Sequence, residues 1–314
     1  ISCSRFAADP LPLQFVADVA LSGDATRLDY ESLDTHSGIL YIAHMGDGAV
    51  IAFDTRNRKV IATIPGMPAV RGVLAVPQLH RVFAAAEGNR EVAVIDMGSD
   101  GVIARLPAGD VDGLAYDPTT KRVFVSDESG ERDVVIDGVR DRVLSAIPLG
   151  GEAGNTVYDE NSQHILVAVQ TSDELVEIDP KRMRIIARYP VRDARHSHGI
   201  ALDPVTHFAY IAGEANATVV AFDLRKRRAV AKSDVGAGVD VLSVDPVLGR
   251  LYVASESGIV SVFDVSNGRF RKLGQSELAL NAHVVAADAK SHLVYFPLKD
   301  VQGKPTLRIM RPQS

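Results

Sequence analysis

A short segment that ends in aspartate recurs at a nearly constant interval along the chain. Each copy is rich in β-branched and aromatic residues and has a turn on both sides, which is the pattern of a β-strand. The closing aspartates lie 42, 41, 42, 44 and 41 residues apart. The copies span residues 50–54, 92–96, 133–137, 175–179, 219–223 and 260–264, with a weaker seventh copy at 307–310. Such a period restricts the chain to a repeat architecture.

Three further strand patterns accompany this segment in most repeats. One ends at a tight turn such as Asp203-Pro204, and another follows it, as at 210–211. A fourth closes most units, for example at 60–64 and 185–188. Seven units of about 42 residues, with four strands each and no helical periodicity, are typical of propeller blades. The sequence therefore predicts an all-β fold, a seven-bladed β-propeller with four antiparallel strands per blade, as a single domain over residues 13–314.

The last repeat contains only three strands before the chain ends. Residues 13–20 form a strand pattern ahead of the first blade, and no other repeat needs them. We therefore expect this N-terminal strand to complete blade 7, because closing the ring removes an exposed sheet edge. Residues 1–12 then form a processed N-terminal tail.

Composition excludes several classes of protein. The 314 residues are 46% hydrophobic and 24% charged with a net charge of −6, which is ordinary globular composition and excludes disorder. No apolar run approaches the roughly 18 residues of a membrane span, and the single cysteine, Cys3, excludes an intrachain disulfide. Net acidity and the lack of tryptophan argue against nucleic acid as a partner. We expect a monomer that binds a small molecule.

The repeat resembles the YVTN-type seven-bladed β-propellers, a bacterial and exported family. The resemblance rests on 197–204 (SHGIALDP) followed by 209–212 (AYIA) and 219–223 (VVAFD), and the copy at 251–255 (LYVAS) is equally close. It covers nearly the whole chain and implies the propeller fold. It leaves the activity open, because the family includes binding proteins and domains of redox enzymes.

One position of the repeat gathers ionisable side chains at the mouth of the central channel. The first strand of each propeller blade lines this channel, and the position five residues before the end of that strand falls at one mouth. Its seven occupants are Asp29, Arg71, Asp112, Gly154, His198, Asp240 and His283. Six of these seven residues, here called the axial ring, are ionisable.

Four of these residues come from consecutive blades and form a candidate metal site. Alternating imidazoles and carboxylates are ligands for zinc, manganese or iron, and calcium is a further option. The predicted ligands, from blades 5, 6, 7 and 1 in that order, are His198, Asp240, His283 and Asp29.

Neighbouring residues supply candidate catalytic and substrate-binding groups. Arg71 is expected to hold an anionic group of the substrate, and Glu31 or His44 to move a proton. Glu31 stands where other blades have mainly apolar residues, so its pKa is expected to be raised. Gly154 is expected to leave a gap beside the ring. The further substrate-binding candidates are Asp112, Asn155, Arg195 and His196.

Two functions remain open on these residues. The first is a metal-assisted hydrolase, lactonase-like, or a lyase that acts on a small polar molecule at the axial mouth. The second is a non-catalytic propeller of the cell envelope that binds a ligand, a metal or a protein. The ring could also be a salt-bridged plug of a wet channel, with Arg71 paired to Asp29 and Asp112.

The N-terminus bears on localisation. Residues 1–3 (ISC) look like the end of a bacterial lipoprotein signal, with Cys3 as a lipid anchor. The alternative is that these three residues are left over from a sequence that has nothing to do with export. Together with the family resemblance, these residues predict an exported protein of the periplasm or cell envelope.

Overall fold

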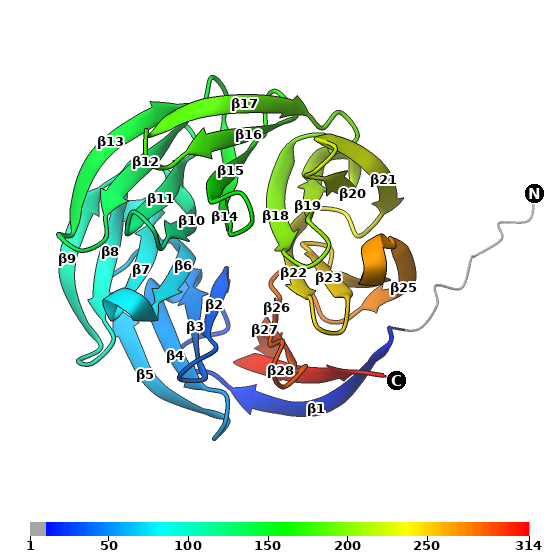
Figure 1. Ribbon diagram of the computed structural model, residues 1–314. Coiled ribbons are helices and arrows are strands. Elements are labelled where there is room, and N and C mark those ends of the chain that lie inside the picture. The colour runs from blue at the N-terminus through cyan, green and yellow to red at the C-terminus, as the bar shows by residue number, and fades with distance from the viewer. Residues whose placement is uncertain (1–10, 314) are drawn as a thin grey trace, which may run out of the picture.

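Seven four-stranded antiparallel sheets surround a central axis in the computed structural model, which describes residues 11–313 (Figure 1). Six sheets are meanders of four consecutive strands and the seventh combines three consecutive strands with β1, and the innermost strand of each lies nearest the axis. The predicted all-β fold with seven blades of four strands is therefore confirmed. Cys3 lies outside the described residues, so its lipidation stays a prediction.

The first three blades follow one another along the chain. Blade 1 comprises β2 (Glu31–Asp34), β3 (Ile39–His44), β4 (Ala49–Asp54) and β5 (Lys59–Pro65). Blade 2 comprises β6 (Val70–Val76), β7 (Arg81–Ala86), β8 (Glu91–Asp96) and β9 (Gly101–Pro107). Blade 3 comprises β10 (Val111–Asp117), β11 (Arg122–Asp127), β12 (Arg132–Asp137) and β13 (Arg142–Pro148).

Blades 4 to 6 repeat the same order. Blade 4 comprises β14 (Ala153–Asp159), β15 (His164–Val169), β16 (Glu174–Asp179) and β17 (Arg184–Pro190). Blade 5 comprises β18 (Ser197–Asp203), β19 (Phe208–Gly213), β20 (Thr218–Asp223) and β21 (Arg228–Asp234). Blade 6 comprises β22 (Val239–Asp245), β23 (Arg250–Ser255), β24 (Ile259–Asp264) and β25 (Arg271–Glu277).

Blade 7 joins the two ends of the chain. It comprises β26 (Ala286–Ala287), β27 (Val294–Val301), β28 (Lys304–Pro312) and, as its outer strand, β1 (Leu13–Ala20). β1 pairs antiparallel with β28, from Leu13 opposite Pro312 to Ala20 opposite Thr306 (Figure 1). The predicted closure by residues 13–20 is confirmed.

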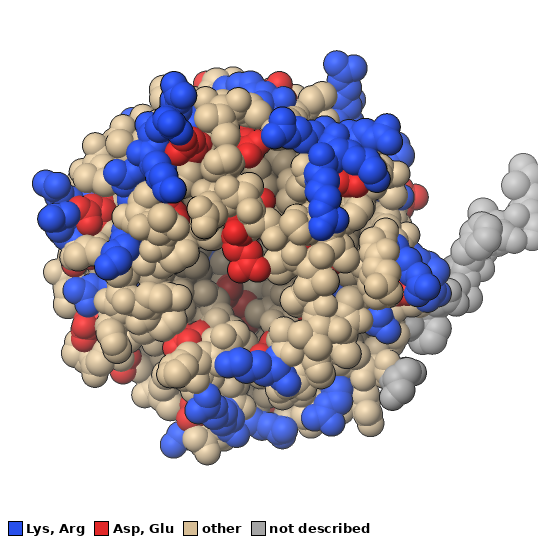
Figure 2. Space-filling view, in the orientation of Figure 1, with Lys and Arg blue, Asp and Glu red and all other residues tan. Residues whose placement is uncertain are grey.

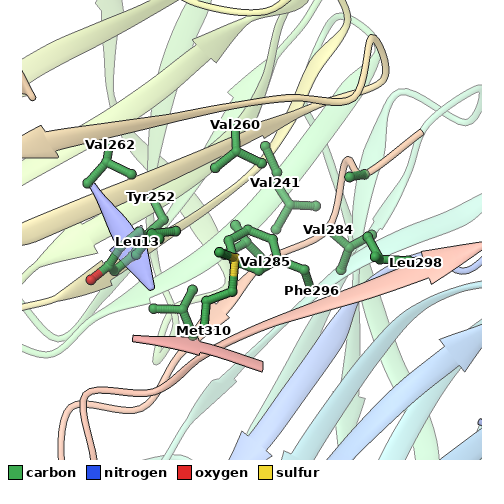
Figure 3. Packing of buried hydrophobic residues seen from close by; sticks show 13 residues of the cluster. Leu13, Val241, Tyr252, Val260, Val262, Val284, Val285, Phe296, Leu298 and Met310 are labelled. Atoms are coloured by element: carbon green, nitrogen blue, oxygen red, sulfur yellow. The ribbon is translucent and has the colours of Figure 1, made fainter. Parts of the chain in front are cut away.

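The apolar core is divided among the interfaces between blades. There are seven buried clusters, and each contains residues of two neighbouring blades. In the cluster between blades 6 and 7, Tyr252 and Val260 face Val284, Phe296 and Met310, and Leu13 of β1 completes it (Figure 3). Each blade is thus stabilised by its neighbours, and no single core lies on the axis.

The only helical elements between residues 11 and 313 are single turns of 3-10 helix. They are η1 (Met45–Asp47), η2 (Pro77–Leu79), η3 (Glu87–Asn89), η4 (Glu214–Asn216) and η5 (Ser266–Gly268). Across the described part of the chain, no helix has the length and apolar character to span a membrane.

The recurrent aspartates hold the turns between strands. In the β4–β5 turn, Asp54 Oδ1 accepts the backbone N–H groups of Arg56 and Asn57, both at 2.9 Å. Asp203 does the same in the β18–β19 turn, with the N–H groups of Val205 and Thr206. These residues therefore serve as turn caps.

Candidate functional site

An extra residue in the inner strand marks the axial ring in five blades. In β10 the pairing moves from Val111 opposite Asp127 to Leu114 opposite Val125, so three steps on one strand match two on the other. The same irregularity occurs in β6, β14, β18 and β22. Bulges of this kind release side chains from regular pairing and re-aim them. The ring residues lie inside these bulges.

Glycines next to the ring bring neighbouring inner strands together. A Cβ on Gly199 would lie 1.9 Å from the backbone oxygen of Asp240, and one on Gly72 would lie 2.0 Å from that of Asp112. Only glycine allows this approach. At Gly154 a Cβ would lie 2.9 Å from His198 Cα. The expected gap at Gly154 was therefore wrong, because the backbone of blade 5 occupies that space.

A cavity of about 390 Å³, here called the mouth chamber, collects ring residues and the ends of the second strands. Its acidic lining residues outnumber the basic ones, with seven carboxylates against two guanidiniums and two imidazoles. They are Asp29, Asp112, Glu128, Glu152, Glu214, Asp240 and Glu256 against Arg27, Arg71, His196 and His198. Figure 2 shows the propeller from one face, with a hollow at its centre, acidic atoms visible inside the hollow and most Lys and Arg nearer the periphery. The chamber therefore favours cations.

The first group of candidate metal ligands is Asp29, Asp240 and His283. His283 Nε2 lies 3.8 Å from Asp29 Oδ1 and 3.9 Å from Asp240 Oδ2. His283 is 1% exposed, and its Nε2 has no hydrogen-bond partner. Its Nδ1 lies 3.0 Å from the backbone oxygen of Asn281. Because a carbonyl only accepts, Nδ1 carries a proton, and Nε2 is the ring atom that faces the two carboxylates.

The second group is Asp112, Glu128 and His198. His198 Nε2 lies 3.3 Å from Asp112 Oδ2 and 3.7 Å from Asp240 Oδ1. The predicted set of four ligands therefore divides. His198 belongs with blade 3, and the other three residues form their own group around His283.

Burial and like charges shift the pKa values of these groups. Burial lowers the pKa of His198, but the hydrogen bond and charge of Asp112 outweigh it and raise that pKa to about 10. His283 follows the same logic with Asp29 and Asp240, and its pKa rises to about 9. Burial raises the pKa of Asp240 to about 6, and burial with Asp112 nearby raises that of Glu128 to about 7. The positive charge of the two imidazoles therefore does not balance the negative charge of all the carboxylates around them.

Tyr30 occupies the centre of the ring and was not predicted. Its hydroxyl donates to Asp240 Oδ1 at 3.0 Å, accepts from Asn155 Nδ2 at 2.5 Å and lies 3.3 Å from His198 Nε2. Burial raises its pKa well above the usual value, so the phenol stays protonated. One sequence signal could have found it. The equivalent residues in the other blades are small or aliphatic, namely Gly72, Gly113, Asn155, Gly199, Val241 and Val284.

The two arginines of the mouth chamber are held by acidic residues at the ends of second strands. Arg71 donates to Glu128 Oε2 at 2.5 Å and lies 4.0 Å from Glu87. Arg27 lies 2.8 Å from Glu256 and 3.5 Å from Asp29. Arg71 thus pairs mainly with Glu128, whereas the alternative plug had paired it with Asp29 and Asp112.

Glu31 lies outside the mouth chamber. It lines a second cavity of about 330 Å³, here called the channel chamber, and Tyr30 and Asn155 contribute to its wall as well. Among residues 11–313, Tyr30 is the one residue that lines both cavities. The structure does not bring Glu31 to the predicted ligands, so a direct role as base or ligand there is not supported.

His44 is also placed away from the mouth chamber. It is fully buried, and its Nε2 lies 2.9 Å from Thr26 Oγ1 and 3.5 Å from Asp47. Burial lowers its pKa. It packs under the loop before blade 1, at Gly23. The expectation that it shuttles a proton is not supported by this position.

The remaining substrate-binding candidates divide in the same way. Asp112 and His196 line the mouth chamber, where His196 Nδ1 lies 3.0 Å from Glu214 Oε2. Arg195 is exposed, is not among the chamber's lining residues, and donates its backbone N–H to Asn216. Asn155 is buried and holds Tyr30.

Fold and site together define a seven-bladed β-propeller whose axis carries an acidic, histidine-containing chamber. Among solved structures, the chain is similar to a chain of Kuenenia stuttgartiensis hydrazine synthase, at 12% identity and a TM-score of 0.78, over 99% of each chain. In all, 1755 solved chains match, so the likeness establishes the fold alone. The sequence matches no family model and no curated protein.

Proposed function

We propose that a divalent cation binds at the edge of the mouth chamber, through Asp29 and Asp240 of its lining and through His283, which is buried beside them outside that lining, and that the chain is a metal-dependent hydrolase or lyase for a small polar molecule. Two carboxylates and one imidazole suit zinc, manganese or iron. Calcium fits less well, because it prefers oxygen ligands.

The hydrogen bonding of His283 carries this proposal. Metal-bound histidines typically donate their other ring N–H to a carbonyl or carboxylate, which fixes the tautomer. His283 has this arrangement, with Nδ1 on the Asn281 carbonyl and a free, buried Nε2 facing two carboxylates. Ligand atoms around a tetrahedral zinc ion lie about 3.4 Å apart. The observed 3.8 and 3.9 Å require inward shifts of only a few tenths of an ångström.

The second group supports proton transfer beside the metal. When bound, a divalent cation supplies positive charge that polarises a carbonyl or activates water. His198, held by Asp112, carries a proton at neutral pH because its pKa is about 10, and it can donate that proton to a leaving group. Arg71 lies at the rim, where its guanidinium can hold a substrate carboxylate.

A specific observation favours a second candidate function, a non-catalytic propeller that binds a ligand or a metal. Tyr30 satisfies Asp240 and Asn155, and Glu128 satisfies Arg71. An axial ring whose polar side chains satisfy one another can serve to hold the blades together at the centre of the propeller. Binding would then occur at the same chamber without turnover.

We further propose that the chain belongs with the YVTN-type propellers and is exported. The repeated segments such as 219–223 and 251–255 support this assignment. The neighbour named as a hydrazine synthase shares the fold at 12% identity, and its named activity is not carried over.

Metal analysis of the purified protein tests the first proposal. The wild-type protein, stripped and then titrated with zinc, manganese or iron(II), should bind one cation per chain. His283→Ala and Asp240→Asn should weaken binding at least tenfold, whereas His36→Ala, an exposed histidine in a turn, should not. Failure of the wild-type protein to bind any of these cations, or equal binding by the variants, would contradict the metal site.

Turnover separates the two functions. A panel of lactones, esters and small hydroxy acids should yield a substrate whose turnover needs the cation and is lost in Asp240→Asn. Stoichiometric metal without turnover of any panel member would favour the non-catalytic propeller.

A further inference from the structure

The channel chamber is a separate compartment from the mouth chamber. This cavity of about 330 Å³ is lined by Tyr30 and also by Thr35, which lies in the turn after β2. Most of its wall is apolar or glycine backbone, including Val73, Leu114, Ile200, Leu242 and Val285. No Lys, Arg or His of the described residues is part of the wall. The chamber can therefore hold a small apolar body of a few carbon atoms.

The buried polar atoms of this wall that lack a hydrogen-bond partner are all acceptors. They are both carboxylate oxygens of Glu31 and Oδ1 of Asn155. Two serine hydroxyls of the same wall already accept backbone N–H groups. Ser32 Oγ accepts the Ala75 N–H and Ser243 Oγ accepts the Ala287 N–H, both at 3.0 Å. A ligand that donates hydrogen bonds would satisfy the oxygens of Glu31 and Asn155 that lack a partner.

Glu31 is the group that a ligand would satisfy. A buried carboxylate without partners is costly. Every other blade has an uncharged residue at this position, from Val73 in blade 2 to Val285 in blade 7. Glu31 is the one carboxylate among the described residues of this wall, and a few polar groups among apolar residues are the arrangement of a binding pocket.

We propose that the channel chamber binds a small primary alkylammonium ion, with its ammonium group on Glu31 and its alkyl chain against the aliphatic wall. An ammonium supplies three donors and a positive charge, and it meets the acceptors that the wall leaves free. This site is independent of the proposed metal, because Glu31 is not part of the mouth chamber.

Calorimetric titration with n-butylammonium and with n-butanol tests the proposal, at a mildly alkaline pH where the amine remains charged. The wild-type protein should bind butylammonium at least tenfold more tightly than butanol. Glu31→Gln should reduce the affinity for butylammonium at least tenfold and leave that for butanol unchanged. Glu277→Gln, the same change on the exposed outer strand β25, should have no effect. Thermal melts of each variant confirm folding, and Glu31→Gln should melt no lower than wild type.

The acidic mouth chamber is the competing location for a cation, and Asp240→Asn distinguishes it. Under the proposal, this variant binds butylammonium as wild type does, although it loses the metal. The proposal is overturned if the wild-type protein shows no preference for the amine. It is also overturned if Glu31→Gln binds as well as wild type, or if Asp240→Asn rather than Glu31→Gln weakens binding. None of these outcomes bears on the metal site.

Discussion

At the scale of single residues, Tyr30 decides how the axis is used. Its hydroxyl links blades 4, 5 and 6 from a strand end in blade 1. The same residue lines both the mouth chamber and the channel chamber. A buried tyrosine whose hydroxyl meets an acid and an amide is a rigid wall, because any rotation leaves those groups without partners.

Tyr30→Phe should lower the free energy of unfolding by about 1–3 kcal/mol, because Asp240 Oδ1 and Asn155 Nδ2 each lose a buried partner. Urea unfolding monitored by circular dichroism measures this. Tyr252→Phe is the matched control, since the Tyr252 hydroxyl is buried without a partner. It should be neutral or slightly stabilising. Equal effects in both variants would mean that the Tyr30 hydroxyl has no special role.

At the scale of elements, the inner strands of five blades share a β-bulge that shapes the site. The bulge in β6, β10, β14, β18 and β22 places five of the seven ring residues, whereas Asp29 and His283 precede the inner strands of blades 1 and 7. In three of these bulges a glycine, Gly72, Gly113 or Gly199, lets the next inner strand approach. The ring is therefore a property of packed strand pairs, and no single blade contains it.

Gly199→Ala should destabilise the protein by about 1–3 kcal/mol, because the new Cβ would meet the Asp240 backbone oxygen at 1.9 Å and push β22 away. The same shift should weaken metal binding through Asp240. Gly98→Ala, in an exposed turn with its nearest contact at 3.4 Å, is the control and should change neither. Denaturant unfolding and metal titration report the two effects. A Gly199→Ala protein as stable as wild type would show that the strands can separate without cost.

At the scale of the whole molecule, stability depends on closing the ring. Each apolar cluster belongs to two blades, so an open ring would lose one interface and leave two blade faces exposed. β1 closes it by covering β28 and by adding Leu13 to the cluster between blades 6 and 7.

Deletion of residues 1–21 should lower the melting temperature by more than about 10 °C, because blade 7 loses its outer strand and β28 becomes a free edge. Differential scanning calorimetry measures the change. A synthetic peptide of residues 11–21 added in excess should restore part of the loss. A truncated chain that melts with the intact one would show that β1 is not needed for closure.

The repeat by itself determined the number of blades, the closing strand and the membership of the axial ring. This is possible because a period near 42 residues and a two-residue alternation fix which side chains face the channel. His283, Asp240 and Asp29 were found in this way, as were the turn-capping aspartates such as Asp54.

Only the tertiary structure decided which ring members meet and on which side of Tyr30 they lie. The approach of backbones at Gly154 and Gly199, and the reach of one tyrosine across the axis, are contacts between residues far apart in sequence. They place Glu31 in one chamber and Asp240 in the other. Periodicity carries no information about such distances, because it describes each blade alone and the chambers exist only between blades.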